Sequence, residues 1–218
     1  RLAMVGAFVA GAAFPTGELR AQDASADLPT LLARFRTVQG LSARFREEKF
    51  IALLEEPLVS EGVLHFVPPA RIARLVERPA SASMVLDGDA LRLSDARGTQ
   101  RIDLQRMPIV RAFVDAFRAV LAGDGAALDR SFRTRLRREA DGGWTLGRSP
   151  RVRAVARAIR WVELAGRDVR ITRLRIIEVS GDESRTVFTD VDTARAYSTA
   201  DVHRIFGARS LMKGPRPR

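Results

Sequence analysis

The spacing of apolar residues changes near the start of the chain, from the period of a helix to that of a β-strand. In residues 27–39 apolar side chains recur every three or four positions, which predicts an amphipathic helix with Asp27 as its N-cap. From residue 42 onward apolar and polar side chains alternate in short segments separated by Pro, Gly and Asp, which predicts strands joined by turns. The first predicted strands are 42–50, 62–67, 72–76, 84–86, 91–93 and 100–104. Asp87-Gly88-Asp89 lies between two of them and predicts a hairpin turn.

One helical pattern, in residues 108–122, interrupts the strands. Its apolar residues form a single stripe, Pro108 suits its first turn and Gly123 its end. Further strands are predicted at 131–138, 143–147, 159–164, 169–179 and 184–191, a helix at 193–206, and the ambiguous segment 151–158 fits one helical turn. These elements together predict an α+β fold that is mainly antiparallel β, arranged as a meander or barrel.

The N-terminal residues have the pattern of an export signal. Arg1 precedes a short apolar run, and Ala21 offers a small residue for cleavage. The apolar run is shorter than the about 20 residues that a membrane helix needs, and a buried helix is the alternative interpretation. We therefore expect a cleaved signal peptide at 1–21, one domain at 22–208, a disordered basic tail at 209–218, and a periplasmic protein.

The chain is basic, with 37 Lys and Arg against 26 Asp and Glu and a formal net charge of +11. Such a charge is compatible with nucleic-acid or anionic-membrane partners. The arginines, however, are scattered along the sequence, whereas a nucleic-acid footprint gathers cations on one face. A nucleic-acid partner is therefore the weaker interpretation, and we expect none.

Residues that carry chemistry are sparse. The chain has no cysteine, which excludes disulfides, thiolate metal sites and cysteine nucleophiles. His65 and His203 lie far apart, without the spacing of metal ligands. Asp87-Gly88-Asp89 lacks the later ligands of a calcium loop. We expect no catalytic residue, no metal and no cofactor, and therefore no enzyme.

The apolar strand faces and the inserted helix admit two interpretations. They form either an ordinary core covered by a helix, or a half-barrel whose concave face holds an apolar ligand beneath that helix. Periodicity alone does not separate the two.

Several motifs, in order, resemble those of the LolA-type outer-membrane lipoprotein carriers. Ser42-Ala43-Arg44-Phe45 resembles the first strand of this family. Gly62-Val63-Leu64-His65-Phe66-Val67-Pro68-Pro69 resembles its Gly-x-Leu-x-Phe strand and proline turn. Leu86-Asp87-Gly88-Asp89-Ala90-Leu91 resembles its Asp-Gly hairpin, and Trp144-Thr145-Leu146 a later strand. The resemblance covers residues 27–190.

The resemblance implies an open, curved half-barrel sheet with helices as a lid over an apolar cavity. It implies a monomeric carrier that takes lipoprotein acyl chains, or another lipid, from an inner-membrane exporter to an outer-membrane acceptor. A periplasmic lipid-sensing regulatory domain of the same fold is the alternative, whereas an anchored receptor of this family needs a cysteine after its leader. The candidate cavity residues are Phe45, Leu64, Phe66, Leu75, Met84, Leu86, Leu91, Leu93, Ile102, Leu104, Ile109, Phe113, Phe117 and Leu121.

One position departs from the family pattern. In the family an arginine directly precedes the turn proline and hydrogen-bonds the lid. In this chain the turn proline is Pro69 and the residue before it is Pro68, whereas Arg71 lies two residues after Pro69. The departure indicates a divergent branch with a looser lid and with a cargo that need not be a lipoprotein.

Overall fold

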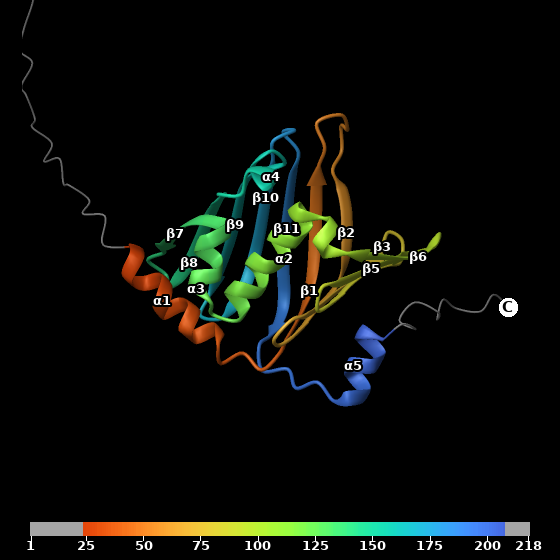
Figure 1. Ribbon diagram of the computed structural model, residues 1–218, viewed down its shortest axis with the longest axis horizontal. Helices are drawn as coiled ribbons and strands as arrows, with labels where there is room; N and C mark the ends of the chain where they lie inside the picture. Colours follow the sequence, from red (N-terminus) through yellow and green to blue (C-terminus); the bar gives the residue numbers. More distant parts are fainter. Residues whose placement is uncertain (1–23, 208–218) are drawn as a thin grey trace, which may run out of the picture.

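Eleven antiparallel strands form one open sheet in the computed structural model, in the order β6-β5-β4-β3-β2-β1-β11-β10-β9-β8-β7 (Figure 1). The structure describes residues 24–207, apart from the side chains of 24–27, 108–110, 113 and 117, so the predicted signal peptide and basic tail lie outside the described residues. The strands are β1 (Leu41–Phe50), β2 (Leu58–Val67), β3 (Arg71–Arg78), β4 (Ala82–Asp87), β5 (Ala90–Asp95), β6 (Gly98–Asp103), β7 (Phe132–Arg138), β8 (Gly143–Pro150), β9 (Ile159–Arg167), β10 (Arg170–Glu178) and β11 (Glu183–Asp192). The predicted fold class is confirmed.

The order of the strands places a helix across one face of the sheet. Strands β1 to β6 form one meander and β7 to β11 another, and β1 pairs with β11 to join them. The chain therefore has to pass from the edge strand β6 to the opposite edge strand β7. It does so through η1 (Leu104–Arg106), α2 (Pro108–Leu121) and α3 (Gly125–Ser131), which lie in front of the sheet (Figure 1).

The helix boundaries differ from the predicted ones where local caps decide. Helix α1 (Ala24–Phe35) begins before Asp27, so Asp27 is not its N-cap. Helix α5 (Thr199–Phe206) is shorter than the predicted 193–206, because Ser198 and Asp201 form a capping box that begins the helix there. The seven-residue helix α3 is capped by Asp124 and is too short for a periodic apolar pattern to reveal it. Helix α4 (Arg153–Ala156) is the single turn expected at 151–158.

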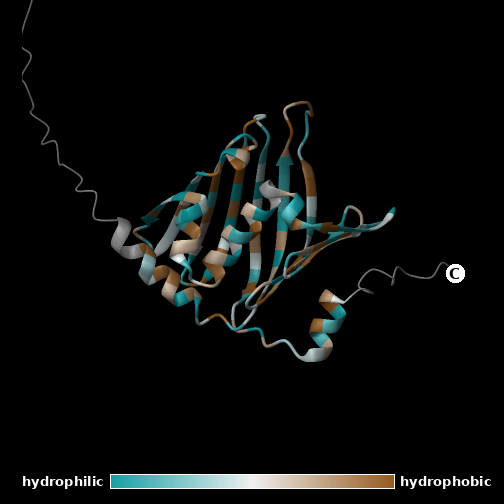
Figure 2. Ribbon diagram, in the orientation of Figure 1, coloured by the Kyte–Doolittle hydropathy of each residue, from teal (hydrophilic) through white to brown (hydrophobic). Residues whose placement is uncertain are grey.

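Alternation along the strands produces two separate apolar clusters. The larger lies between the sheet and the helices α1, α2 and α3, and it includes Phe45, Phe66 and Leu146. The smaller lies on the opposite face, where Ile205 and Phe206 of α5 pack against β3 and β4. Figure 2 shows the hydrophobic stripe of α5 and the alternating strand residues. None of the described helices is long and apolar enough to cross a membrane.

Candidate functional site

Most of the predicted cavity residues lie on the face of the sheet that α2 crosses. That concave face carries every second residue of the strands, and its apolar members form one buried cluster with α2. Seven predicted residues are buried there: Phe45, Leu64, Phe66, Leu86, Leu91, Leu104 and Leu121. Met84, Leu93 and Ile102 are half-buried on the same face and pack against this cluster.

Leu75 is the exception among the predicted residues. Its side chain lies on the opposite face, in the cluster that contains Ala73 and α5. Ile72 and Val76, the alternate residues of β3, face the concave side instead. The predictions of Ile109, Phe113 and Phe117 concern side chains outside the described residues, although their backbone belongs to α2.

Two small cavities lie beneath or beside α2 among the described residues. One cavity of about 50 Å³ is lined by Ala116 and Val120 of α2 and by residues of β7 to β10. A second, of about 10 Å³, lies between β1, β2, β10 and β11. A ligand pocket usually measures about 300–1,000 Å³, so a long apolar ligand requires α2 to move away from the sheet.

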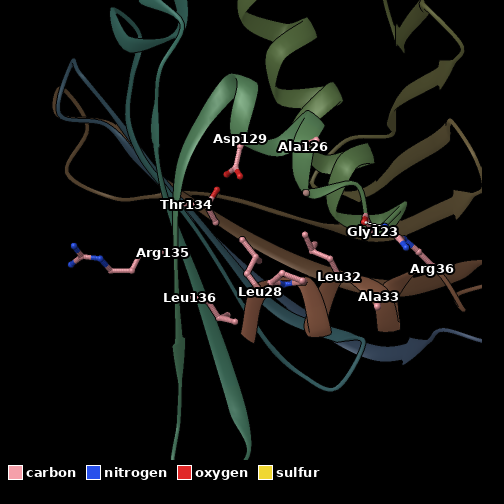
Figure 3. A pocket seen from close by; sticks show the side chains of 12 residues that line it. Leu28, Leu32, Ala33, Arg36, Gly123, Ala126, Asp129, Thr134, Arg135 and Leu136 are labelled. Carbon is pink, nitrogen blue, oxygen red and sulfur yellow. Dashed lines mark hydrogen bonds between the residues drawn. The ribbon is translucent and has the colours of Figure 1, made fainter. Parts of the chain in front are cut away.

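Two larger hollows lie at the margins of the sheet. A groove of about 830 Å³ runs between α1, α3 and the edge strand β7, and Figure 3 shows Leu28 and Leu32 of α1 facing Thr134 and Leu136 of β7 across it. The other, of about 650 Å³, lies over β3 to β6 and is lined in part by Met84 and Leu93. Both hollows adjoin the apolar cluster beneath α2, because residues of that cluster line them.

Arg118, in the last turn of α2, ties this helix to the sheet. Its guanidinium Nη2 donates to the carbonyl oxygen of Ala70, at 3.0 Å, and to that of Gly88. These carbonyls belong to the β2–β3 and β4–β5 turns. Helix α2 is thus attached to the β2–β3 turn by Arg118, although Pro68 stands where the resemblance led us to expect an arginine.

A charged pair marks the end of the apolar surface beyond α2. Arg74 Nη2 lies 3.1 Å from Glu47 Oε2, and the Arg74 guanidinium lies 4.2 Å from the centre of the Phe45 ring. Arg74 Nη2 also donates to Ser60 Oγ at 3.0 Å. These side chains are half-buried and satisfied, so they limit the apolar face without offering a free charge to a ligand.

Arg148 of β8 lies inside the site, and the sequence interpretation missed it. It follows Trp144 and Leu146 on the concave face, is 4% exposed, and lines the cavity of about 50 Å³. Its Nε and Nη2 have no hydrogen-bond partner among the described residues. Burial lowers the pKa of Arg148 to about 9, which leaves the guanidinium charged at neutral pH. The signal in the sequence was an arginine at an inward-facing position of an alternating strand.

The described residues at this site do not include a group of side chains able to hold a metal ion. The described residues contain no cluster of three or more His, Asp or Glu side chains that could hold a metal ion. His65 lies on the face opposite the cavity, with its Nδ1 2.9 Å from the hydroxyl of Tyr197. Desolvation by burial lowers the pKa of His65, so this ring is mostly neutral at pH 7. The geometry of the concave face suits binding of an apolar group.

Several solved structures are similar to the chain in fold. Solved structures similar to it include the LolA superfamily protein NE2245 from Nitrosomonas europaea, with 12% identity, a TM-score of 0.46, and coverage of 80% of this chain and 95% of that chain. A DUF1329 family protein from Desulfovibrio piger has 11% identity, a TM-score of 0.45, and coverage of 86% and 97%. The MucA/MucB complex of Pseudomonas aeruginosa matches with 17% identity, a TM-score of 0.46, and coverage of 81% and 60%. No curated protein sequence matches the chain.

The decisive comparison is with a family described as outer membrane lipoprotein carrier protein LolA-like, whose model matches residues 20–208. This match spans every described strand and helix and agrees with the open antiparallel sheet crossed by α2. The chain therefore belongs to the LolA-like family of outer membrane lipoprotein carrier proteins.

Proposed function

We propose that the protein is a periplasmic carrier that binds the acyl chains of lipoproteins, or of a related lipid, against its concave face and moves them towards the outer membrane. One observation carries this proposal: helices cover the apolar concave face, and the central one, α2, is tied to two turns of the sheet by the hydrogen bonds of Arg118. Family membership supports lipid binding as the general function.

The physical chemistry of an acyl chain explains why a carrier needs such a face. Burying one CH₂ group contributes about 0.8 kcal/mol, so a chain of about 16 carbons is less stable in water than in an apolar site by roughly 13 kcal/mol. A carrier offers a dry surface of this kind but must bind less tightly than a membrane, or release would stall. The covering helix meets both needs, because α2 can pack against the concave face once the acyl chain leaves and so shield that face from water.

The proposal assigns no chemical step to the protein. Transfer from an inner-membrane exporter to an outer-membrane acceptor breaks no covalent bond, so it needs no catalytic residue and no cofactor. The protein would act as a monomer, because a single chain provides both the face and its cover. A lipid-sensing regulatory domain would bind the same ligand without passing it on, so the two functions differ in transfer rather than in binding.

Native mass spectrometry of the protein isolated from its own periplasm tests the proposal directly. We expect a co-purified acyl-bearing lipid, which dissociates when the protein is unfolded. Fluorescence titration with an acyl probe should show saturable binding, and vesicle-to-vesicle transfer of the probe should accelerate in the presence of the protein. Binding without accelerated transfer would favour the sensing function.

Two neighbouring residues of β2 provide a matched pair of variants. Leu64 faces the concave side, and Val63 lies on the opposite face of the same strand. Leu64→Glu should weaken probe binding at least 10-fold, because its carboxylate would be desolvated without a partner. Val63→Glu should leave probe binding unchanged. Urea unfolding should first show that both variants are folded. Equal probe affinity in the two folded variants would then contradict binding at the concave face.

A further inference from the structure

We propose that Arg148 binds the oxyanion of the cargo, so that the ligand is an amphiphile whose acyl chain ends in a carboxylate or phosphate headgroup. This inference rests on the proposed function and narrows it, since it selects an anionic lipid from the lipids that an apolar face could hold. The site is the cavity beneath α2 where Arg148 faces Ala116, Val120 and Leu174.

The cavity beside Arg148 is apolar. The cavity that it lines is otherwise formed by Ala, Val, Leu and Phe side chains from α2, β7, β9 and β10. Desolvation is the one influence on its pKa, and no described carboxylate acts on it. A buried charge without a counterion is costly, and proteins normally supply a partner when they bury one.

Other arginines in the chain show what a structural role looks like. Arg118 donates to the carbonyl oxygens of Ala70 and Gly88. Arg92 donates to two consecutive carbonyl oxygens at the end of α5, at 2.7 and 2.9 Å, and Arg36 donates to the carbonyl oxygen of Gly123 at 3.0 Å. Each of these arginines links two elements. Arg148 has none of these links among the described residues, although its position is the most buried.

A second unpartnered donor lies beside Arg148. Thr134 of β7 is its direct partner in the antiparallel register, which places both side chains on the same face. The Thr134 hydroxyl is buried and also lacks a hydrogen-bond partner among the described residues. Thr134 lines the groove between α1, α3 and β7, where the exposed Asp129 of α3 points towards it (Figure 3). A guanidinium and a hydroxyl side by side can both donate to one carboxylate or phosphate.

The arrangement also explains how an amphiphile would lie. With its oxyanion at Arg148, the acyl chain can follow the concave face beneath α2 towards Leu64 and Phe66, which belong to the same apolar cluster. An anionic headgroup would satisfy the guanidinium that is unpartnered in the closed form. Neutral lipids would fill the same apolar face but leave the charge of Arg148 buried and unpaired.

Paired fluorescent probes test this inference. cis-Parinaric acid and its methyl ester have the same chain, but the ester replaces the charged carboxylate with a slightly larger uncharged group. We expect the wild-type protein to bind the acid about 10- to 100-fold more tightly than the ester, since hydrogen bonds between charged partners in a dry site contribute on that scale. Arg148→Met should abolish this preference by weakening the acid alone, and Arg148→Lys should retain part of it.

The control variant is Arg133→Met, which removes one positive charge from an exposed position of β7 and should leave the preference for the acid intact. Competition with a lysophosphatidic acid, inorganic phosphate and acetate separates an amphiphile from a free anion. Displacement of the probe by the lysophosphatidic acid, but not by phosphate or acetate, supports the inference. If inorganic phosphate alone displaces the probe, and Arg148→Met abolishes this displacement, the site binds a free anion and the inference is overturned.

The remaining outcomes distinguish this inference from the proposed function. If the acid and the ester bind equally and Arg148→Met changes neither, the inference is overturned while the carrier function stands. If neither probe binds, the carrier function itself fails. Urea unfolding of Arg148→Met should show stability equal to or above that of the wild type, because an apolar side chain there removes an unpaired buried charge. A large loss of stability would show that Arg148 is structural.

Discussion

Arg118 illustrates how much one side chain can decide at the residue scale. Its side chain is only 15% exposed, and it joins α2 to two hairpin turns that are distant in sequence. The neighbouring carboxylates Asp115 and Asp89 lie 3.8 and 3.9 Å from Nη1, which is too long for strong ion pairs. The carbonyl acceptors therefore provide the attachment of α2 to the sheet.

Arg118→Met should loosen the lid while retaining much of the side chain's apolar packing. We expect the free energy of unfolding to fall by about 1–3 kcal/mol, because the variant cannot form the hydrogen bonds from a charged donor to two carbonyls. The association rate of an acyl probe should rise, since α2 opens more readily. Stopped-flow fluorescence and urea unfolding measure the two effects.

The matched control for this prediction is Arg111→Met on the same helix. Arg111 has a side chain that is 43% exposed and pairs with Asp115 at 3.4 Å, an i,i+4 pair worth about 0.3–0.5 kcal/mol. It should change neither the stability nor the probe kinetics appreciably. Identical probe kinetics in the Arg118 and Arg111 variants would show that the hydrogen bonds of Arg118 do not control the lid.

At the scale of elements, the two faces of the sheet are covered by different helices with different roles. Helix α2 lies over the concave face and closes the candidate site, whereas α5 packs on the opposite face against Ala73 and Val85. Stability and ligand binding should therefore respond separately to changes in these two helices.

Ser198→Ala tests this separation. Ser198 Oγ accepts a hydrogen bond from the Asp201 backbone N–H at 3.1 Å and begins α5. Loss of this N-cap hydrogen bond in Ser198→Ala should lower the free energy of unfolding by about 1 kcal/mol, as for other N-caps. Acyl-probe affinity should stay at the wild-type value, and a 10-fold loss of affinity would show that α5 is coupled to the concave face. Thermal unfolding and probe titration give the two readings, and Ser180→Ala, in the exposed β10–β11 turn, is the control.

At the scale of the whole molecule, the pairing of β1 with β11 holds the two meanders together, and a charged network lies beside it. Glu183, at the start of β11, accepts from Arg175 Nε at 2.7 Å and also from Arg185. These hydrogen bonds lower the pKa of Glu183 to about 2. A carboxylate whose pKa is lower in the folded protein than in the unfolded chain stabilises the fold at pH values above its unfolded-state pKa. This contribution is lost as the pH falls towards the folded-state pKa.

The stability of the molecule should therefore decline as the pH falls from about 4.5 towards about 2, in part because Glu183 becomes protonated. Glu183→Gln should be less stable than the wild type at pH 7, and it should lose less stability across this range. Urea unfolding at a series of pH values measures the slope. Glu56→Gln, in the exposed β1–β2 loop, is the control and should show the wild-type dependence of the unfolding free energy on pH. If Glu183→Gln also shows the wild-type dependence, Glu183 does not contribute to the loss of stability.

The sequence by itself determined the local elements and the fold class. Alternation predicted the strands of both meanders, and the apolar stripe of residues 108–122 predicted α2 almost to its ends. Asp87-Gly88-Asp89 predicted the β4–β5 turn, where Gly88 has a positive φ of 59° that glycine adopts at no steric cost. These features depend on neighbours a few residues apart, and the sequence records such neighbours directly.

The tertiary structure alone decided which surfaces face the site. Leu75 was predicted for the cavity because β3 has apolar residues on both faces, and only the positions of α2 and α5 show which side each one joins. Arg148 appeared as one arginine among many, because its burial arises where α2, β7, β9 and β10 meet around it. Desolvation of a side chain depends on packing between distant segments, so the central charge of the candidate site emerged only from the folded chain.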